Sequence, residues 1–243
     1  MLTTLTKIFI SIIISFLLLS CNANFNNGVT GKGEIVSREK TLNEDFDEIS
    51  IAMGWKVELI SSDKNKIIMK ANENLIPLLE YELHNGSLRI ESEKTINRAR
   101  SKLLKVYHRQ PIASFKTSSG SSLSSNEKIT IENLDIKTSS GSSIKLDIKT
   151  KNADIKTSSG SSVELKGTAI NFNSKSSSGS EIDAKNLLVK NAKIKTSSGA
   201  NISIEAKEYL EANTSSGGSI NYYGDPEKKK LKQSVSGGSI NKR

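Results

Sequence analysis

Cysteine and histidine, the side chains most often used as nucleophiles, metal ligands and proton carriers, are scarce in this chain. Its 243 residues include one Cys and two His, at positions Cys21, His84 and His108. A single Cys excludes a disulfide framework and a zinc site built on cysteines. The histidines have no clustered partners, and no Ser-His-Asp set or nucleophile elbow is recognisable. We therefore expect no cofactor, no metal site and no enzyme.

Carboxylates are the next candidates, because two pairs of them occupy equivalent positions of an internal repeat. The pairs are Asp135 with Asp154 and Glu164 with Asp183. Carboxylates about 5 Å apart serve retaining glycosidases and also bind Ca²⁺. Trp55 and the pair Tyr222-Tyr223 could add a sugar-stacking surface. A lysine accompanies each acidic pair, so we expect a neutralised, solvated face and keep carbohydrate binding or turnover as the alternative.

Lysine recurs four residues before the glycine of five successive repeats. The five residues are Lys116, Lys137, Lys156, Lys175 and Lys195. The chain carries a formal net charge of +9, and residues 115–243 hold 20 Lys+Arg against 13 Asp+Glu. Such a face attracts anionic glycans or lipid head groups, whereas flexible lysines screened by salt would bind nothing. These five lysines form a candidate polyanion-binding face.

The elements that must position these residues follow from the repeat, whose core reads I-K-T-S-S-G-S-S-[ILV]. Its glycines recur at steps of 18 to 21 residues, at Gly120, Gly141, Gly160, Gly179, Gly199, Gly217 and Gly237. The residue three after each glycine is always aliphatic, and the residue before it is always Ser. Strict columns over seven copies argue against a flexible serine-rich linker, which is the alternative, and indicate a solenoid.

Side chains alternate across a strand, so the positions −5, −3, −1, +1 and +3 from the glycine should share the inner face. That face would carry an aliphatic spine and stacked Ser and Thr hydroxyls. Only 35% of the residues are hydrophobic, which also favours a thin interior that tolerates hydroxyls. We predict an all-β chain with parallel β-solenoid coils of about twenty residues over 115–243, with an exposed loop at 228–230.

The N-terminal residues read as an export signal with a lipid anchor. Lys7 precedes an apolar stretch at 8–19, which is short for a transmembrane helix. The stretch ends Leu-Leu-Ser-Cys, which resembles a bacterial lipobox with Cys21 as the acylated residue; an ordinary secretory signal is the alternative. We expect 1–20 to be a lipoprotein signal peptide and 21–33 a flexible tether, with the protein anchored in the outer membrane.

Residues 34–114 lack the repeat but are also β-rich. Asn85-Gly86 between alternating runs predicts a β-hairpin. The runs at 55–61 and 67–70 should form a second antiparallel pair across the turn at 63–65. A short helical turn is expected at 74–79, and a loop at 95–102.

The order of these segments resembles the head GIN domain family. The matching pieces are 31–33, 38, 46–51, 54–59, 71–77, 86–90 and the glycine series. The resemblance covers roughly residues 31–220. It implies a fold similar to a right-handed parallel β-helix, and an envelope lipoprotein of Bacteroidetes-type bacteria described as an auto-transporter adhesin head. It implies no catalytic residues.

Three functions follow as hypotheses. The first is a non-enzymatic, adhesin-like surface or periplasmic binding and scaffold module. The second is the carbohydrate-binding or carbohydrate-active β-helix, and the third is a spacer or signalling partner without a ligand. Expected partners are the membrane, through Cys21, and anionic glycans or another envelope protein. Export makes nucleic acid a poor partner, and neither the oligomeric state nor the surface or periplasmic side follows from the residues.

Overall fold

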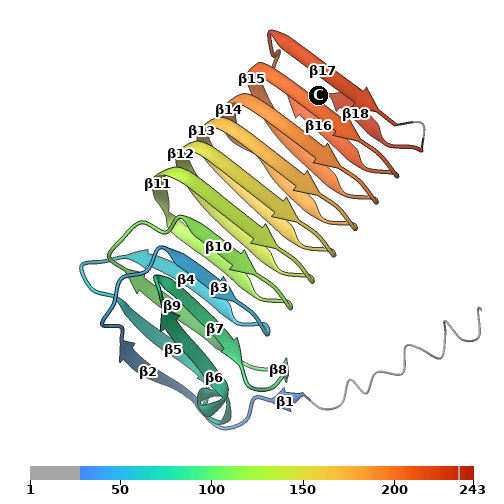
Figure 1. Ribbon diagram of the computed structural model, residues 1–243. Coiled ribbons are helices and arrows are strands. Elements are labelled where there is room, and N and C mark those ends of the chain that lie inside the picture. The colour runs from blue at the N-terminus through green and yellow to red at the C-terminus, as the bar shows by residue number, and fades with distance from the viewer. Residues whose placement is uncertain (1–27, 235) are drawn as a thin grey trace, which may run out of the picture.

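The computed structural model describes residues 28–234 and 236–243 as an all-β rod (Figure 1). The predicted parallel β-solenoid is confirmed. Its elements are, in chain order, β1 (Val29–Thr30), β2 (Ile35–Thr41), β3 (Glu48–Ile51), β4 (Lys56–Ser61), β5 (Lys66–Asn72), the 3₁₀ helix η2 (Glu73–Leu78), β6 (Leu79–His84), β7 (Ser87–Ser92), β8 (Ile96–Arg98), β9 (Lys102–His108), β10 (Ser114–Thr117), β11 (Ser122–Thr138), β12 (Ser143–Thr157), β13 (Ser162–Ser176), β14 (Glu181–Thr196), β15 (Asn201–Thr214), β16 (Ser219–Tyr223), β17 (Lys228–Gln233) and β18 (Ser239–Lys242).

Each central coil is one long bent strand followed by a tight turn, so the rod has two layers of strands. The front layer in Figure 1 runs β6-β7-β3-β10, then the C-terminal halves of β11 to β15, then β17. The back layer runs β2-β5-β9-β4, then the N-terminal halves of β11 to β15, then β16 and β18. Neighbouring coils are spaced by about 4.8 Å, the ladder distance.

The bend between the two layers coincides with a slip in the inside–outside alternation. In β12 the buried positions alternate up to Thr150, and the next buried residue is Ala153. Lys151 and Asn152 therefore both face outward. Two consecutive outward residues let the strand turn a corner without breaking the backbone ladder to its neighbours.

The opposite corner is a stack of type I′ turns, one per coil. At Ser118–Ser121 the N–H of Ser121 donates to the carbonyl of Ser118 at 3.1 Å, and the central residues Ser119 and Gly120 have φ of 50° and 70°. Gly120 N–H also donates to the Ser140 carbonyl of the next turn at 3.0 Å. The expectation that the serine before each glycine faces the interior is wrong, because its left-handed conformation turns it outward, as Ser119 shows.

The inner face carries the predicted aliphatic spine. Ile182 is fully buried and lies in register between Val163 and Ile202. Two columns of buried hydroxyls line the interior beside the turns, and they bond across coils. Thr138 Oγ1 and Ser161 Oγ are 2.9 Å apart, and this bond has equivalents in neighbouring coils. Because these hydroxyls are paired, the thin interior tolerates them without large apolar side chains.

An asparagine ladder at the bend was missed by the sequence analysis. Asn152 donates to Asn133 Oδ1 at 2.8 Å, Asn171 to Asn152 at 2.8 Å, and Asn191 to Asn171 at 3.2 Å. All four asparagines lie eight residues before the glycine that follows them. The recurrence of Asn at this position in four successive repeats is the sequence signal that would have predicted the ladder. Asn152 and Asn171 each donate one and accept one of these bonds, and the ladder ties the bends of four coils together.

The N-terminal section continues both layers and covers the end of the rod. The Asn85-Gly86 hairpin is confirmed by the antiparallel pairing of β6 with β7. The second expected hairpin is wrong: β5 pairs with β2 and β9, while β4 pairs with β9 and β11. Within 95–102, expected as a loop, β8 pairs with β1. Leu75 of η2 is fully buried, so this helix helps close the core at the N-terminal end.

The C-terminal lysine run is a strand and not the expected loop. β17 pairs in parallel with the end of β15, from Tyr209 with Lys228 to Thr214 with Gln233. All six of its residues are exposed, because no further coil stacks on it in the described part of the chain. None of the helices in that part is long and apolar enough to span a membrane.

Replacing Ile182 by Asp tests the spine. Ile182→Asp places a carboxylate without a partner in a fully buried column, which should lower the free energy of unfolding by at least about 3 kcal/mol. Lys195→Ser, on the exposed face of the same coil, is the control and should leave it almost unchanged. Urea denaturation followed by circular dichroism measures both, and equal midpoints would contradict the column assignment.

Replacing Asn171 by Ala tests the asparagine ladder. The variant removes one donated and one accepted hydrogen bond from the half-buried centre of the stack. We expect a loss of about 1–2 kcal/mol in the free energy of unfolding. Asn201→Ala is the matched control, since Asn201 is exposed and no side-chain hydrogen bond is found for it in the described structure. If both variants unfolded at the same urea concentration as the wild type, the ladder would not contribute to stability.

Candidate functional site

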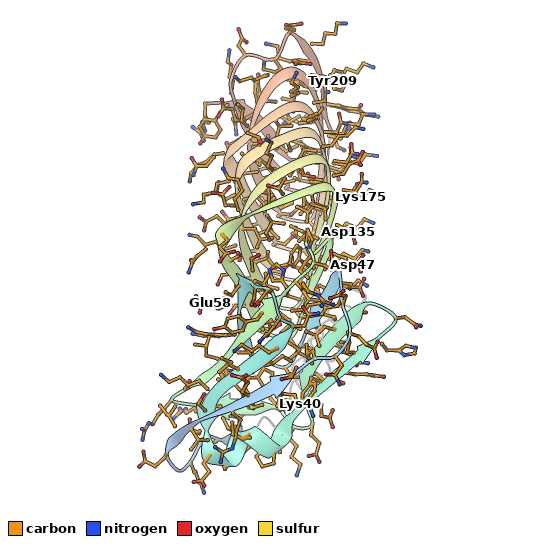
Figure 2. All side chains as sticks on the ribbon, turned by 90° about the vertical axis from the view of Figure 1, so that its left-hand side faces the viewer. Lys40, Asp47, Glu58, Asp135, Lys175 and Tyr209 are labelled. Carbon is orange, nitrogen blue, oxygen red and sulfur yellow. The ribbon has the colours of Figure 1, made fainter. Side chains whose placement is uncertain are left out.

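The five lysines of the candidate face stack in register on the front layer, as the glycine alignment predicts. The column runs from Lys116 through Lys137, Lys156 and Lys175 to Lys195, one residue per coil. Figure 2 shows Lys175 and Asp135 on one edge of the rod and Glu58, from the back layer, on the opposite edge. We call this column the basic face. Like charges held at adjacent rungs repel. Whether nearby carboxylates neutralise these lysines therefore decides whether the face can bind an anionic ligand.

The N-terminal end of the basic face is neutralised by carboxylates. Lys116 Nζ lies 2.8 Å from Glu48 Oε2, and Lys137 Nζ lies 2.6 Å from Asp135 Oδ2. Glu48 also accepts hydrogen bonds from Ser87 and Ser114. The bond from Lys116 is the main cause that lowers the pKa of the Glu48 carboxyl. This end of the column is an internally compensated network.

The rest of the column lacks such compensation. In the described structure no ion pair is found for Lys156, Lys175 or Lys195, and all three are exposed. The neighbouring outward column offers these coils Asp154, Asn173 and Lys193, which stack on Asp135. This neighbouring column therefore has no carboxylate on β13 and β14, before Glu211 follows on β15. The uncompensated charge of the basic face lies over β12 to β14.

Shallow grooves follow this uncompensated stretch. One, of about 780 Å³, is lined by Lys175, Lys195 and Lys232 together with Ser, Thr and Asn side chains and Glu211. A second, of about 420 Å³, adjoins it and includes Lys156 and Lys193. The grooves bring ammonium groups and hydroxyls together along an open surface. This arrangement can hold an extended chain of anionic groups through many weak, charge-assisted contacts.

Two of the groove lysines escaped the sequence analysis. Lys232 continues the column, because it pairs with Asn213, which pairs with Lys195. It lies five residues before Gly237 and not four, so alignment on the glycines shifts it out of register. Lys193 belongs to the column of Asp135 and Asp154, and the acids in that column concealed it.

The paired carboxylates do lie on adjacent rungs, as expected, and lysines accompany them. Asp135 is bound by Lys137, Glu164 by Lys145 at 2.8 Å and Asp183 by Lys185 at 2.9 Å. Among the described residues no cluster of His, Cys, Asp and Glu has the form of a metal site. Three of the four acids are thus partners of lysines, and no ion pair is found for Asp154 in the described structure.

The histidines and aromatic residues have structural surroundings. The ring of His108 is buried, and its Nδ1 is 2.8 Å from the carbonyl oxygen of Gln110, while His84 contacts the Asn85 side chain at the hairpin turn. Trp55 is fully buried in the N-terminal section, and Tyr222 is buried at the C-terminal end. Both rings are in the core, whereas the ring of Tyr223 is half-buried, so Trp55 and Tyr222 add nothing to an exposed sugar-stacking surface.

A separate hollow of about 560 Å³ lies at the bend, away from the basic face. It is lined by the apolar side chains of Ile131, Ile170 and Leu188 together with lysines and the carboxylates Glu132 and Glu208. Ile170 is 43% exposed where neighbouring coils place charged residues in the same column.

Comparison with known proteins agrees with this architecture. The profile of the family described as "Putative auto-transporter adhesin, head GIN domain" matches residues 45–226. Among curated protein sequences, none matches the chain.

Solved structures with the same fold come from Bacteroidetes. A "putative adhesin" from Bacteroides fragilis is 18% identical, with 89% of this chain and 100% of that chain aligned and a TM-score of 0.81. A "putative lipid binding protein" from Parabacteroides distasonis is 22% identical over 88% and 99% of the two chains, with a TM-score of 0.69. At these identities the likeness shows the fold alone. Since the family profile spans most of the sequence, the chain belongs to the head GIN domain family.

Proposed function

We propose that this protein is a non-enzymatic, adhesin-like binding module of the cell envelope that holds acidic polymers on its basic face. The observation that carries the proposal is the in-register stack of Lys156, Lys175 and Lys195, without ion-pair partners in the described structure, along adjoining grooves. The family description as an adhesin head supports a binding role at the envelope and export from the cytoplasm. The ligand class is an anionic glycan.

The regular spacing of the lysines suits a repetitive ligand. Each coil presents one ammonium group about 4.8 Å from the next, so a flexible polymer with closely spaced sulfate, phosphate or carboxylate groups meets several lysines at once. Individual contacts between exposed charges are weak and are screened by salt. Affinity must therefore come from their number, and it should depend strongly on ionic strength.

Binding of dextran sulfate, with neutral dextran as the matched probe, tests the basic face. Changing Lys156, Lys175 and Lys195 together to Ser should weaken binding at low salt by about ten- to hundredfold, as expected from three weak contacts. Wild-type binding should also fall steeply as salt is raised. Isothermal titration calorimetry or surface plasmon resonance measures both.

The control variant changes Lys149, Lys151 and Lys190 to Ser, which removes the same charge from the bend of the rod. It should retain most of the wild-type affinity. Equal losses in the two triple variants would mean that net charge alone governs binding. The proposal would be contradicted by tight binding that ignores salt, or by no binding at low salt.

The membrane attachment forms the second part of the proposal and rests on Cys21, which lies outside the described residues. Its lipobox-like context predicts an acyl anchor, and two or three acyl chains bind a membrane stably. Cells grown with an alkyne-tagged fatty acid should label the wild-type protein and not the Cys21→Ala variant. Persistent labelling of that variant would contradict the anchor. Protease treatment of intact cells then distinguishes a surface location from a periplasmic one.

A further inference from the structure

The front layer has a free sheet edge at each end of the rod. Within the described residues, β6 bonds only to β7, and β17 bonds only to β15. Each strand therefore presents a row of unpaired backbone N–H and C=O groups, which is a template for pairing with another strand. Both strands are six residues long, and they end the same layer of the same sheet.

The N-terminal edge is acidic outside and apolar inside. Along β6 the side chains of Tyr81 and Leu83 are partly buried against the core, whereas those of Glu80, Glu82 and His84 are exposed. The strand is antiparallel to β7 and so runs against the direction of the solenoid strands of the front layer. An incoming solenoid strand would meet it in antiparallel orientation.

The C-terminal edge is basic outside and has an uncovered apolar residue inside. Leu231 lies in register with Ala212, which is fully buried, yet 46% of Leu231 is exposed because no coil in the described structure lies beyond it. Lys230 and Lys232 continue the outward columns of Glu211 and Asn213. The inward position of Lys229 is compensated by Asp225, 3.1 Å away.

We infer that β17 of one copy pairs antiparallel with β6 of a second copy, joining the rods end to end. Full overlap of the two strands places Lys230 opposite Glu82 and Lys232 opposite Glu80 on the outer face. The same register places Leu231 opposite Tyr81 on the inner face. One alignment thus satisfies the free backbone groups, opposes unlike charges and covers the exposed leucine.

A lysine-rich edge is also a common means of preventing strands from pairing, so the partner edge decides between the two roles. A purely protective edge would repel every other edge, and salt would relieve that repulsion. Here the opposite end of the same sheet carries carboxylates at the matching outward positions. End-to-end pairing should therefore be strongest at low salt, whereas protection predicts that association increases with salt.

The pairing is heterologous, because the two partners contribute different surfaces. Each copy keeps one free end, so association continues into a row of rods. In such a row the uncompensated lysines of successive copies lie along one continuous layer, separated by the compensated N-terminal end of each rod. A long polyanion would therefore engage several copies at once. This assembly goes beyond the proposed function and does not require it, because the basic face retains its residues whether or not the ends pair.

Disulfide cross-linking in cells tests the contact on the full chain. The double variant Glu82→Cys/Lys230→Cys should give a ladder of multimers on non-reducing gels after mild oxidation, since each copy carries both halves of the contact. Every variant also carries Cys21→Ala, so that the introduced cysteines are the only thiols. Either single variant should then give dimers at most. The control double variant Glu39→Cys/Lys230→Cys uses β2, an edge of the back layer, and should give no ladder. A missing ladder, or an equal ladder in the control, would overturn the inference.

Charge reversal gives an independent readout by light scattering on the purified protein. Glu80→Lys/Glu82→Lys and Lys230→Glu/Lys232→Glu should each abolish the low-salt association of the wild type. Mixing the two variants should restore it, because the reversed ends match each other. Wild-type protein that stays monomeric at low salt and associates only at high salt would show that the edge is protective. Binding of dextran sulfate to Lys156, Lys175 and Lys195 is measured separately, so failure of either idea leaves the other testable.

Discussion

Parallel stacking of successive coils is the constraint on which the rest of this structure depends. The backbone ladder fixes each residue directly over its counterpart in the next coil. A side chain must therefore be compatible with copies of itself a ladder spacing away. Aliphatic residues, hydroxyls and carboxamides meet this condition well, because each packs against or bonds to its own kind. The spine at Ile182, the paired hydroxyls at Thr138 and Ser161 and the ladder through Asn171 are three solutions to one problem.

Stacked lysines satisfy the same constraint poorly, because their charges repel. A column of lysines therefore points to a role other than stabilising the fold. At Lys116 and Lys137 the repulsion between rungs is relieved by carboxylates. From Lys156 to Lys195 the stacked lysines have no ion-pair partner in the described structure, although Asp154 shows that the adjacent column accommodates an acid. Water and salt screen these charges in isolation. An acidic polymer along the grooves would neutralise several of them together, and this connects the repeat to the proposed binding role.

The two ends of the rod differ in how the core is covered. At the N-terminal end, η2 and the antiparallel strands around β2 and β6 close the core, and Leu75 fills its interior. At the C-terminal end of the described structure no coil lies beyond β17 and β18, and Leu231 is exposed. A solenoid is extended by adding a coil of similar shape, so its open end has an intrinsic affinity for another strand. The opposite charges of β6 and β17 give that affinity a direction.

The sequence by itself determined the fold class, the coil length and the position of the basic face. Column identity at the glycines, the aliphatic residues and Lys116 to Lys195 carries this information, because a ladder converts sequence period directly into spatial neighbours. The hairpin at Asn85-Gly86 was equally local. Only the tertiary structure decided that the serine before each glycine turns outward, that β5 pairs with β2 and β9, and that Lys232 joins the basic column. The first depends on the handedness of a turn, the second on pairing between distant strands, and the third on a shift in coil length. The pairing of β5 and the shift of Lys232 leave no period in the sequence, because they arise where the regular stacking begins or ends. The serine recurs in every repeat, but only its backbone conformation shows which way it points.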